Sequence, residues 1–89
     1  MHKPKYKIPK RLVLQKSEKN LVVFDSISSK MIILNKTAAI ILNKIRTGYD
    51  DRGIADYLQR NFSVSREQAE KDVRKTISDL LSNKVIERN

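Results

Sequence analysis

Three short runs of β-branched or large apolar residues lie close together in the first half of the chain, and this feature restricts the fold most. The runs occupy residues 12–15, 21–24 and 31–34, and the polar segments 16–20 and 25–30 separate them. Runs of this length between turn-forming residues are typical of β-strands. The gaps are short enough for hairpin connections. The sequence therefore predicts an antiparallel three-stranded β-meander.

Three later segments have apolar residues at the three- and four-residue spacings of an amphipathic helix. We expect helices over residues 36–47, from 50 or 51 to about 60, and from 65 to about 83. Gln68 would complete a capping box by reaching back to the start of the third helix. The predicted N-terminal caps are Asn35, Asp50 or Asp51, and Ser65, and Gly48 is the predicted C-terminal cap of the first helix.

These elements predict an α+β fold, a three-stranded antiparallel meander followed by a winged-helix-like bundle of three helices. The chain of 89 residues is long enough for one domain. Lys and Arg total 19 against 10 Asp and Glu, a net charge of +9. Residues 1–11 hold five of these bases and no acid, which leaves +4 for the single domain expected over residues 12–89. Such a basic N-terminal arm can steer an anionic partner toward the domain.

The composition argues against catalysis and metal binding. The chain has no Cys and one His, His2, which we expect to be inert near the terminus. Gly48 and Gly53 are the only glycines, so no phosphate-binding loop is present. We expect a protein that is not an enzyme and uses no cofactor. No apolar stretch resembles a membrane span or a signal peptide, which predicts a cytoplasmic protein without a membrane partner.

The second and third predicted strands are apolar on both faces. Met31 and Ile33 point to one face, and Ile32 and Leu34 point to the other. Three helices cover only one face of a small sheet. The other face therefore needs the N-terminal arm, a second copy in a homodimer, or a ligand.

The third strand of a meander lies at an edge, where free N–H and C=O groups can pair with another strand. Four or five such hydrogen bonds would contribute about 3 to 6 kcal/mol before ordering costs. The third helix can form a wall beside this edge, because Asp72, Thr76 and Asp79 share one of its flanks. We therefore predict a peptide-binding groove between the third strand and the third helix, although an ordinary solvated helix face explains the same three residues.

DNA binding is the alternative, because a winged-helix outline and a net charge of +9 both suit it. The third helix, which would enter the major groove, has no net charge between residues 66 and 83. Its carboxylates would offset most of the attraction to phosphate. The opposing side chains are Arg66, Lys71, Arg74 and Lys75 against Glu67, Glu70, Asp72 and Asp79.

The segment 34–48, which begins Leu-Asn-Lys-Thr-Ala-Ala-Ile-Ile, resembles the strand-to-helix signature of the PqqD-like family, named after a pyrroloquinoline quinone biosynthesis protein. The resemblance covers roughly residues 12–87. Many members have Trp at the position of Leu42 and an aromatic residue at that of Met31. Both differences are apolar replacements, so we expect the core to be kept.

The resemblance implies a RiPP recognition element, which holds the leader of a ribosomally made precursor peptide and presents it to a maturation enzyme such as a leader peptidase. The chain looks most like the separate leader-binding proteins of lasso-peptide pathways, and similar proteins serve radical SAM enzymes. The leader would add as a strand, with Met31 and Ile33 or Ile32 in the pocket depending on register. The basic arm would attract an acidic leader or touch the enzyme. By position, the implied peptide-binding residues are Lys30, Met31, Ile32, Ile33 and Leu34 in the strand and Asp72, Lys75, Thr76 and Asp79 in the helix.

Overall fold

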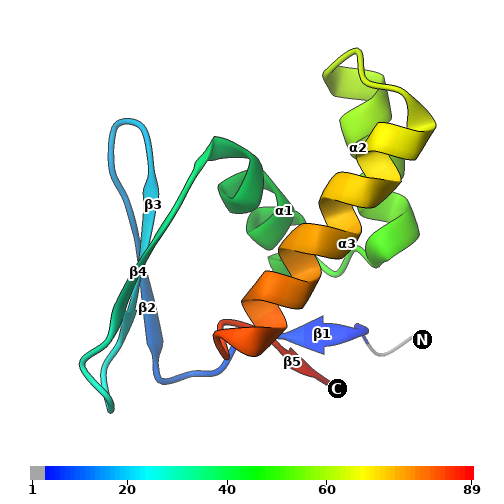
Figure 1. Ribbon diagram of the computed structural model, residues 1–89. Coiled ribbons are helices and arrows are strands. Elements are labelled where there is room, and N and C mark those ends of the chain that lie inside the picture. The colour runs from blue at the N-terminus through cyan, green and yellow to red at the C-terminus, as the bar shows by residue number, and fades with distance from the viewer. Residues whose placement is uncertain (1–3) are drawn as a thin grey trace.

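The computed structural model describes residues 4–89 and places a three-stranded sheet beside a group of three helices (Figure 1). This arrangement confirms the predicted α+β fold. His2, expected to be inert, lies outside the described residues. In chain order the elements are β1 (Tyr6–Lys7), β2 (Leu12–Lys16), β3 (Leu21–Asp25), β4 (Met31–Leu34), α1 (Lys36–Arg46), α2 (Asp51–Asn61), α3 (Arg66–Ser82) and β5 (Glu87–Arg88).

The sheet is the predicted meander, with strand order β2-β3-β4 and antiparallel pairing throughout. Val23 on the central strand pairs with Leu14 on one side and with Ile32 on the other. All three side chains pack against the hydrophobic core, and Val23 is only 1% exposed. Because successive side chains of a strand alternate between faces, this register also fixes which residues point away from the helices.

Each helix begins after a side-chain oxygen that accepts a backbone N–H three residues later, as predicted. Gly48 ends α1 with a φ of +95°, and its N–H donates to the carbonyl of Ile45. The predicted return of Gln68 to the cap of α3 is wrong, because its amide donates to Asp72 at 2.8 Å. A capping box would need the Gln68 side-chain oxygen to accept the N–H of Ser65, and within residues 4–89 these two residues share only the bond from Gln68 N–H to the Ser65 hydroxyl. The three N-terminal caps are Asn35, Asp50 and Ser65, at 2.9, 2.9 and 3.1 Å.

The core lies where α1 meets β4 and the other two helices (Figure 1). Leu42, at the position where many PqqD-like proteins have Trp, is completely buried. Fully burying an aliphatic side chain of this size contributes about 1.5 to 3 kcal/mol, so the replacement keeps the core. The largest fully buried side chains are Ile41, Leu42, Ile54, Ile86, Val23, Val73 and Val85.

A second, two-stranded sheet joins the two ends of the described chain and was not predicted. Tyr6 in β1 pairs with Arg88 in β5, and the N–H of Asn89 donates to the carbonyl of Lys5 at 3.0 Å. The Tyr6 side chain is 3% exposed, and its hydroxyl donates to Asp51 Oδ1 at 2.8 Å. Burial, and then this contact, raise the pKa of Tyr6 above its ordinary value. Part of the expected basic arm is therefore built into the fold.

Candidate functional site

A groove runs between β4 and α3 and has a volume of about 380 Å³. It contains seven of the nine residues predicted to bind peptide. The start of α1 and the segment after α3 form the rest of its lining. From the predicted set these residues are Ile32, Ile33, Leu34, Asp72, Lys75, Thr76 and Asp79, and the others are Asn35, Thr37, Ala38, Leu80, Asn83 and Val85.

The backbone of β4 has one row of hydrogen-bonding groups that β3 does not use. Asp25 N–H donates to the carbonyl of Lys30 at 2.8 Å, which makes this a hydrogen-bonded pair. Antiparallel pairs alternate, so Ile32 and Leu34 also point their N–H and C=O groups toward β3. Met31 and Ile33 point theirs outward. Within residues 4–89 no strand pairs with this outer edge of β4.

The side chains of β4 divide between the two faces of the sheet. Ile32 and Leu34 pack toward the core and contribute apolar surface to the groove. Met31 and Ile33 lie on the opposite face and are 64% and 63% exposed. Ile33 also borders the groove, since its strand forms one wall. The sequence left open whether the side chains of Met31 and Ile33 or that of Ile32 would point into the pocket. In the structure the Ile32 side chain points to the groove side.

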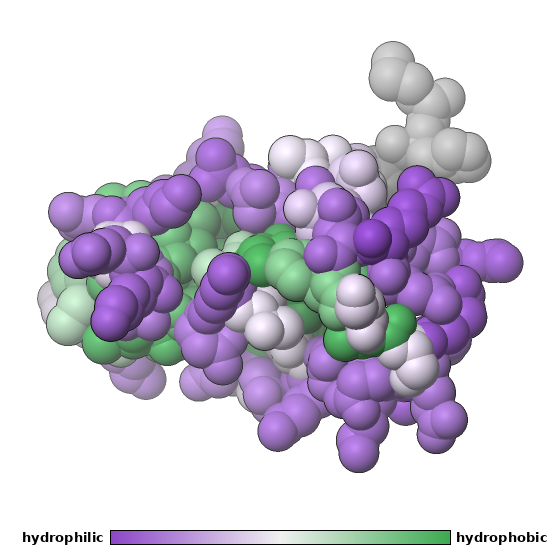
Figure 2. Space-filling view, turned by 90° about the horizontal axis from the view of Figure 1, so that it is seen from above, coloured by the Kyte–Doolittle hydropathy of each residue, from purple (hydrophilic) through white to green (hydrophobic). Residues whose placement is uncertain are grey.

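The opposite face of the sheet is an exposed apolar surface. Its register places Val13, Phe24 and Met31 in one row across the three strands and Val22 beside Ile33 in the next. Val13 is 53% exposed. Figure 2 shows hydrophobic atoms over the sheet, at the left of the view, with hydrophilic side chains around them. The expectation of a second apolar face was therefore correct, and the described residues leave it open.

The wall formed by α3 supplies polar groups at the spacing expected from its sequence. Asp72, Thr76 and Asp79 follow one another along the flank that faces β4, with Lys75 beside them. The Asp72 carboxylate accepts a hydrogen bond from the side-chain amide of Gln68, and this bond orients the carboxylate on the helix. These groups can accept hydrogen bonds from, or pair with charges on, a segment lying in the groove.

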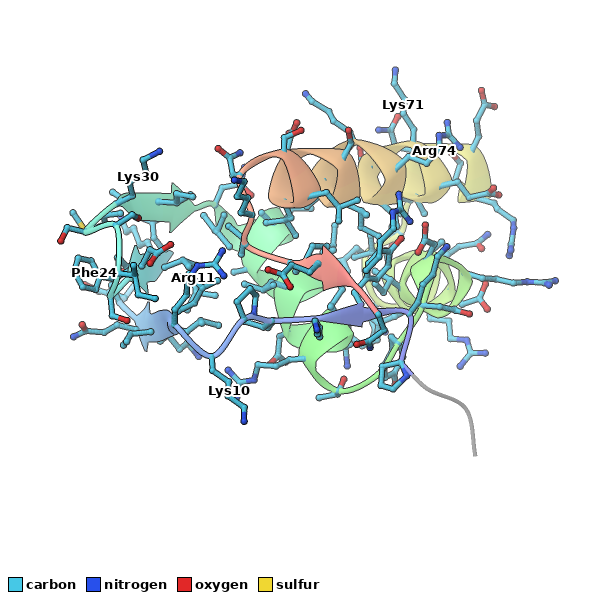
Figure 3. All side chains as sticks on the ribbon, turned by 90° about the horizontal axis from the view of Figure 1, so that it is seen from below. Lys10, Arg11, Phe24, Lys30, Lys71 and Arg74 are labelled. Carbon is cyan, nitrogen blue, oxygen red and sulfur yellow. The ribbon has the colours of Figure 1, made fainter. Side chains whose placement is uncertain are left out.

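Lys30 and Met31, the other two predicted residues, border an adjoining hollow of about 340 Å³. This hollow shares Ile32, Asn83 and Val85 with the groove and continues it toward the β3–β4 turn. Figure 3 shows Lys30 at the edge of the sheet nearest α3. All nine predicted residues therefore lie along one continuous depression.

A fixed carboxylate stabilises the turn at this end. Asp25 accepts the N–H groups of Ile27 and Ser28 at 2.9 and 3.2 Å, and Arg11 Nε donates to it at 3.0 Å. These contacts, the two backbone bonds most of all, lower the pKa of Asp25 to about 2. Arg11 also reaches Glu87 at 3.5 Å and so connects the meander to β5.

The sequence did not identify the contributions of Asn35, Thr37, Ala38 and Val85 to the groove. The sequence predicted Asn35 only as a helix cap, and it assigned no role to Val85. The cap is confirmed, and capping depends on residues 35–38 alone, so it carries no information about the groove.

Within residues 4–89 no group of three His, Cys, Asp or Glu side chains is placed to hold a metal ion. No polar or charged side chain of this part of the chain is buried. No helix in it is long and apolar enough to cross a membrane.

The fold and this depression define a class of protein, an α+β winged-helix-like domain with an open strand edge beside a helix. The chain belongs to the PqqD family: residues 20–86 match the family described as coenzyme PQQ synthesis protein D. No curated protein sequence matches the chain.

Two solved structures have the same fold. One is described as lasso peptide synthetase B1 complexed with the leader peptide, with a TM-score of 0.86 and 23% identity over 93% of this chain and 98% of that one. The other is TbiB1 in complex with the TbiA(beta) leader peptide, with a TM-score of 0.83 and 21% identity over 91% of this chain and 94% of that one.

Proposed function

We propose that this protein binds the leader segment of a ribosomally made precursor peptide and presents it to a maturation enzyme, such as a leader peptidase. The leader adds as a strand to the outer edge of β4. The observation that carries the proposal is the unused row of backbone groups at Met31 and Ile33, which faces a groove walled by α3.

The number of free backbone groups on β4 also supports strand addition. Met31 and Ile33 offer two N–H and two C=O groups, enough for four hydrogen bonds to a guest backbone. At about 0.5 to 1.5 kcal/mol each, these bonds are too weak to hold a peptide alone. The apolar side chains of Ile32, Leu34 and Leu80 in the groove supply further burial, and polar groups of α3 fix the register.

The similar structures support the same proposal, because both are described as complexes with leader peptides. We further propose that the protein has no catalytic activity of its own and acts through its partners. A ribosomally made peptide is synthesised in the cytoplasm, so we place the protein there. The identity of its precursor peptide would show whether the protein serves a lasso-peptide pathway or a radical SAM pathway.

The exposed sheet face is the surface that we propose for the maturation enzyme. A guest strand on β4 would continue this face beyond Met31 and Ile33, so an enzyme docked there would touch both protein and leader. A homodimer closed by the same face is the competing occupant. Analytical ultracentrifugation of the free protein distinguishes the two, because a dimer would persist without the enzyme.

The charges of α3 favour peptide over DNA. Arg66 is bound to Asp56 at 3.0 Å and to Glu70 at 3.2 Å. Lys71 and Arg74 lie toward the end of α3 far from the sheet and from Lys30 (Figure 3). The bases therefore do not form one continuous stripe for a phosphate backbone.

Fluorescence anisotropy tests the proposal. The probes are a fluorescein-labelled leader peptide, taken from a short precursor gene to be identified by genome sequencing around this protein's gene, and a labelled random duplex DNA, each titrated over a salt series. We expect saturable leader binding that falls by no more than about tenfold over the salt series and weak DNA binding that falls far more steeply. DNA binding without leader binding would overturn the proposal.

A further inference from the structure

The depression along β4 does not have the same charge at its two ends. In the groove beside Ile32, Ile33 and Leu34 the charged lining side chains are Asp72, Lys75 and Asp79, with a net charge of −1. At the opposite end Lys30 and Lys84 border both the adjoining hollow and a third one near the β3–β4 turn. A segment lying along the whole depression therefore passes from carboxylates to lysines.

The carboxylates near the lysines already have a partner. Arg11 pairs with Asp25 at 3.0 Å and with Glu87 at 3.5 Å, so its guanidinium forms ion pairs with both carboxylates. Among residues 4–89 no ion pair involves Lys30 or Lys84. Both lysines are exposed, so their positive charge is available to a ligand.

From this geometry we infer that the groove selects peptides with an acidic residue at the end that lies beside Lys30 and Lys84, and disfavours an acid at the end beside Asp72 and Asp79. The inference rests on the proposed function and names a specificity determinant within it. Lys30 and Leu34 are separated by four residue steps, or about 13 Å at 3.3 Å per residue. The acid therefore has a fixed spacing from the residue that pairs near Leu34.

Each exposed lysine is expected to contribute a modest preference. Solvent-exposed ion pairs change affinity by about two- to fivefold, so the two lysines together give about tenfold for Asp or Glu over Asn or Gln. The preference should weaken as salt is raised, because both lysines are in contact with solvent.

A displayed library of random 12-residue peptides, selected on the full immobilised chain, tests the inference. We expect the selected peptides to share an apolar anchor and an Asp or Glu on one side of it. Selection on the K30E/K84E variant should replace that acid by Lys or Arg. Selection of no peptide at all would overturn the proposed function together with this inference. Selected peptides without a positional acid, or an unchanged acid in the variant, would overturn the inference alone.

A matched control separates the local charge from the net charge. K71E and K71E/R74E make the same changes of net charge as K30E and K30E/K84E, but on α3 at a distance from Lys30 (Figure 3). One selected peptide and its Asp-to-Asn or Glu-to-Gln counterpart are titrated against each protein. The wild type, K71E and K71E/R74E should prefer the acidic form by about tenfold, and K30E/K84E should lose or reverse this preference. K30E alone serves if the double variant melts early. Loss of the preference in the matched α3 variant as well would overturn the inference.

Discussion

Replacing Ile33 by Pro removes one of the two backbone donors that we propose for the guest strand. Proline has no N–H, and the N–H of Ile33 points away from β3. Proline is tolerated on edge strands where the missing N–H would face outward. The I33P variant is therefore expected to keep the fold and lose part of the binding site.

The size of the effect follows from the hydrogen bond that is lost. A net backbone bond contributes about 0.5 to 1.5 kcal/mol, and a peptide carbonyl left without a donor in the groove adds about 1 to 3 kcal/mol. The guest carbonyl keeps some contact with water, so we expect a loss near the middle of this range. Leader affinity should fall by about tenfold to a hundredfold, equivalent to about 1.4 to 2.8 kcal/mol.

The assay is anisotropy with the labelled leader, and K16P is the matched control. Lys16 is exposed on β2, the other edge of the sheet. Ser17 N–H pairs with Asn20, so by alternation the N–H of Lys16 points outward as well. Circular dichroism and thermal melting establish that both variants fold. Wild-type affinity in folded I33P, or an equal loss in K16P, would refute strand addition at β4.

Three further predictions concern the core, the turn and the groove. Tyr6→Ala should lower the free energy of unfolding by about 3 to 5 kcal/mol in urea titration, because the ring is buried; a loss below about 1 kcal/mol would mean that β1 merely flanks the fold. The carboxyl of Asp25 should titrate near pH 2 by NMR. Because its pKa is lowered on folding, its stabilisation is present above the unfolded value near 4 and is lost as the pH falls from about 4 to about 2; a midpoint at the ordinary 3.8 would contradict the contacts described. Ile32→Asp should weaken leader binding at least tenfold while the protein remains folded, whereas Val13→Asp, on the other face of the distant edge strand, should not; similar affinities for the two variants would reject the groove assignment.

The meander and the helices could be predicted because their signals are local. The apolar runs at residues 12–34 and the caps Asn35 and Ser65 act within a few residues of chain. The pairing of Tyr6 with Arg88 could not be predicted, since a two-residue strand has no periodicity and its partner lies at the other end of the chain. The contact of Gln68 was open for a different, local reason. Its side chain can turn back to Ser65 or forward to Asp72, and the sequence does not show which contact forms.

The groove was predictable in outline for a physical reason. A meander leaves its last strand at an edge, and helical periodicity put Asp72, Thr76 and Asp79 on one flank of α3. The direction of each side chain of β4 depended on the register with β3, so Ile32 and Met31 could not be assigned to faces of the groove in advance. The lining from Asn35 and Val85 required the tertiary arrangement itself.

Amide hydrogen exchange measured by NMR, without and with saturating leader peptide, tests strand addition most directly. In the free protein the amides of Met31 and Ile33 should exchange quickly and that of Ile32 slowly, because of these three residues only Ile32 donates its N–H to β3. On binding, Met31 and Ile33 should become protected by at least tenfold while Ile32 changes little. Unchanged exchange at Met31 and Ile33 in the saturated complex would show that the leader binds elsewhere.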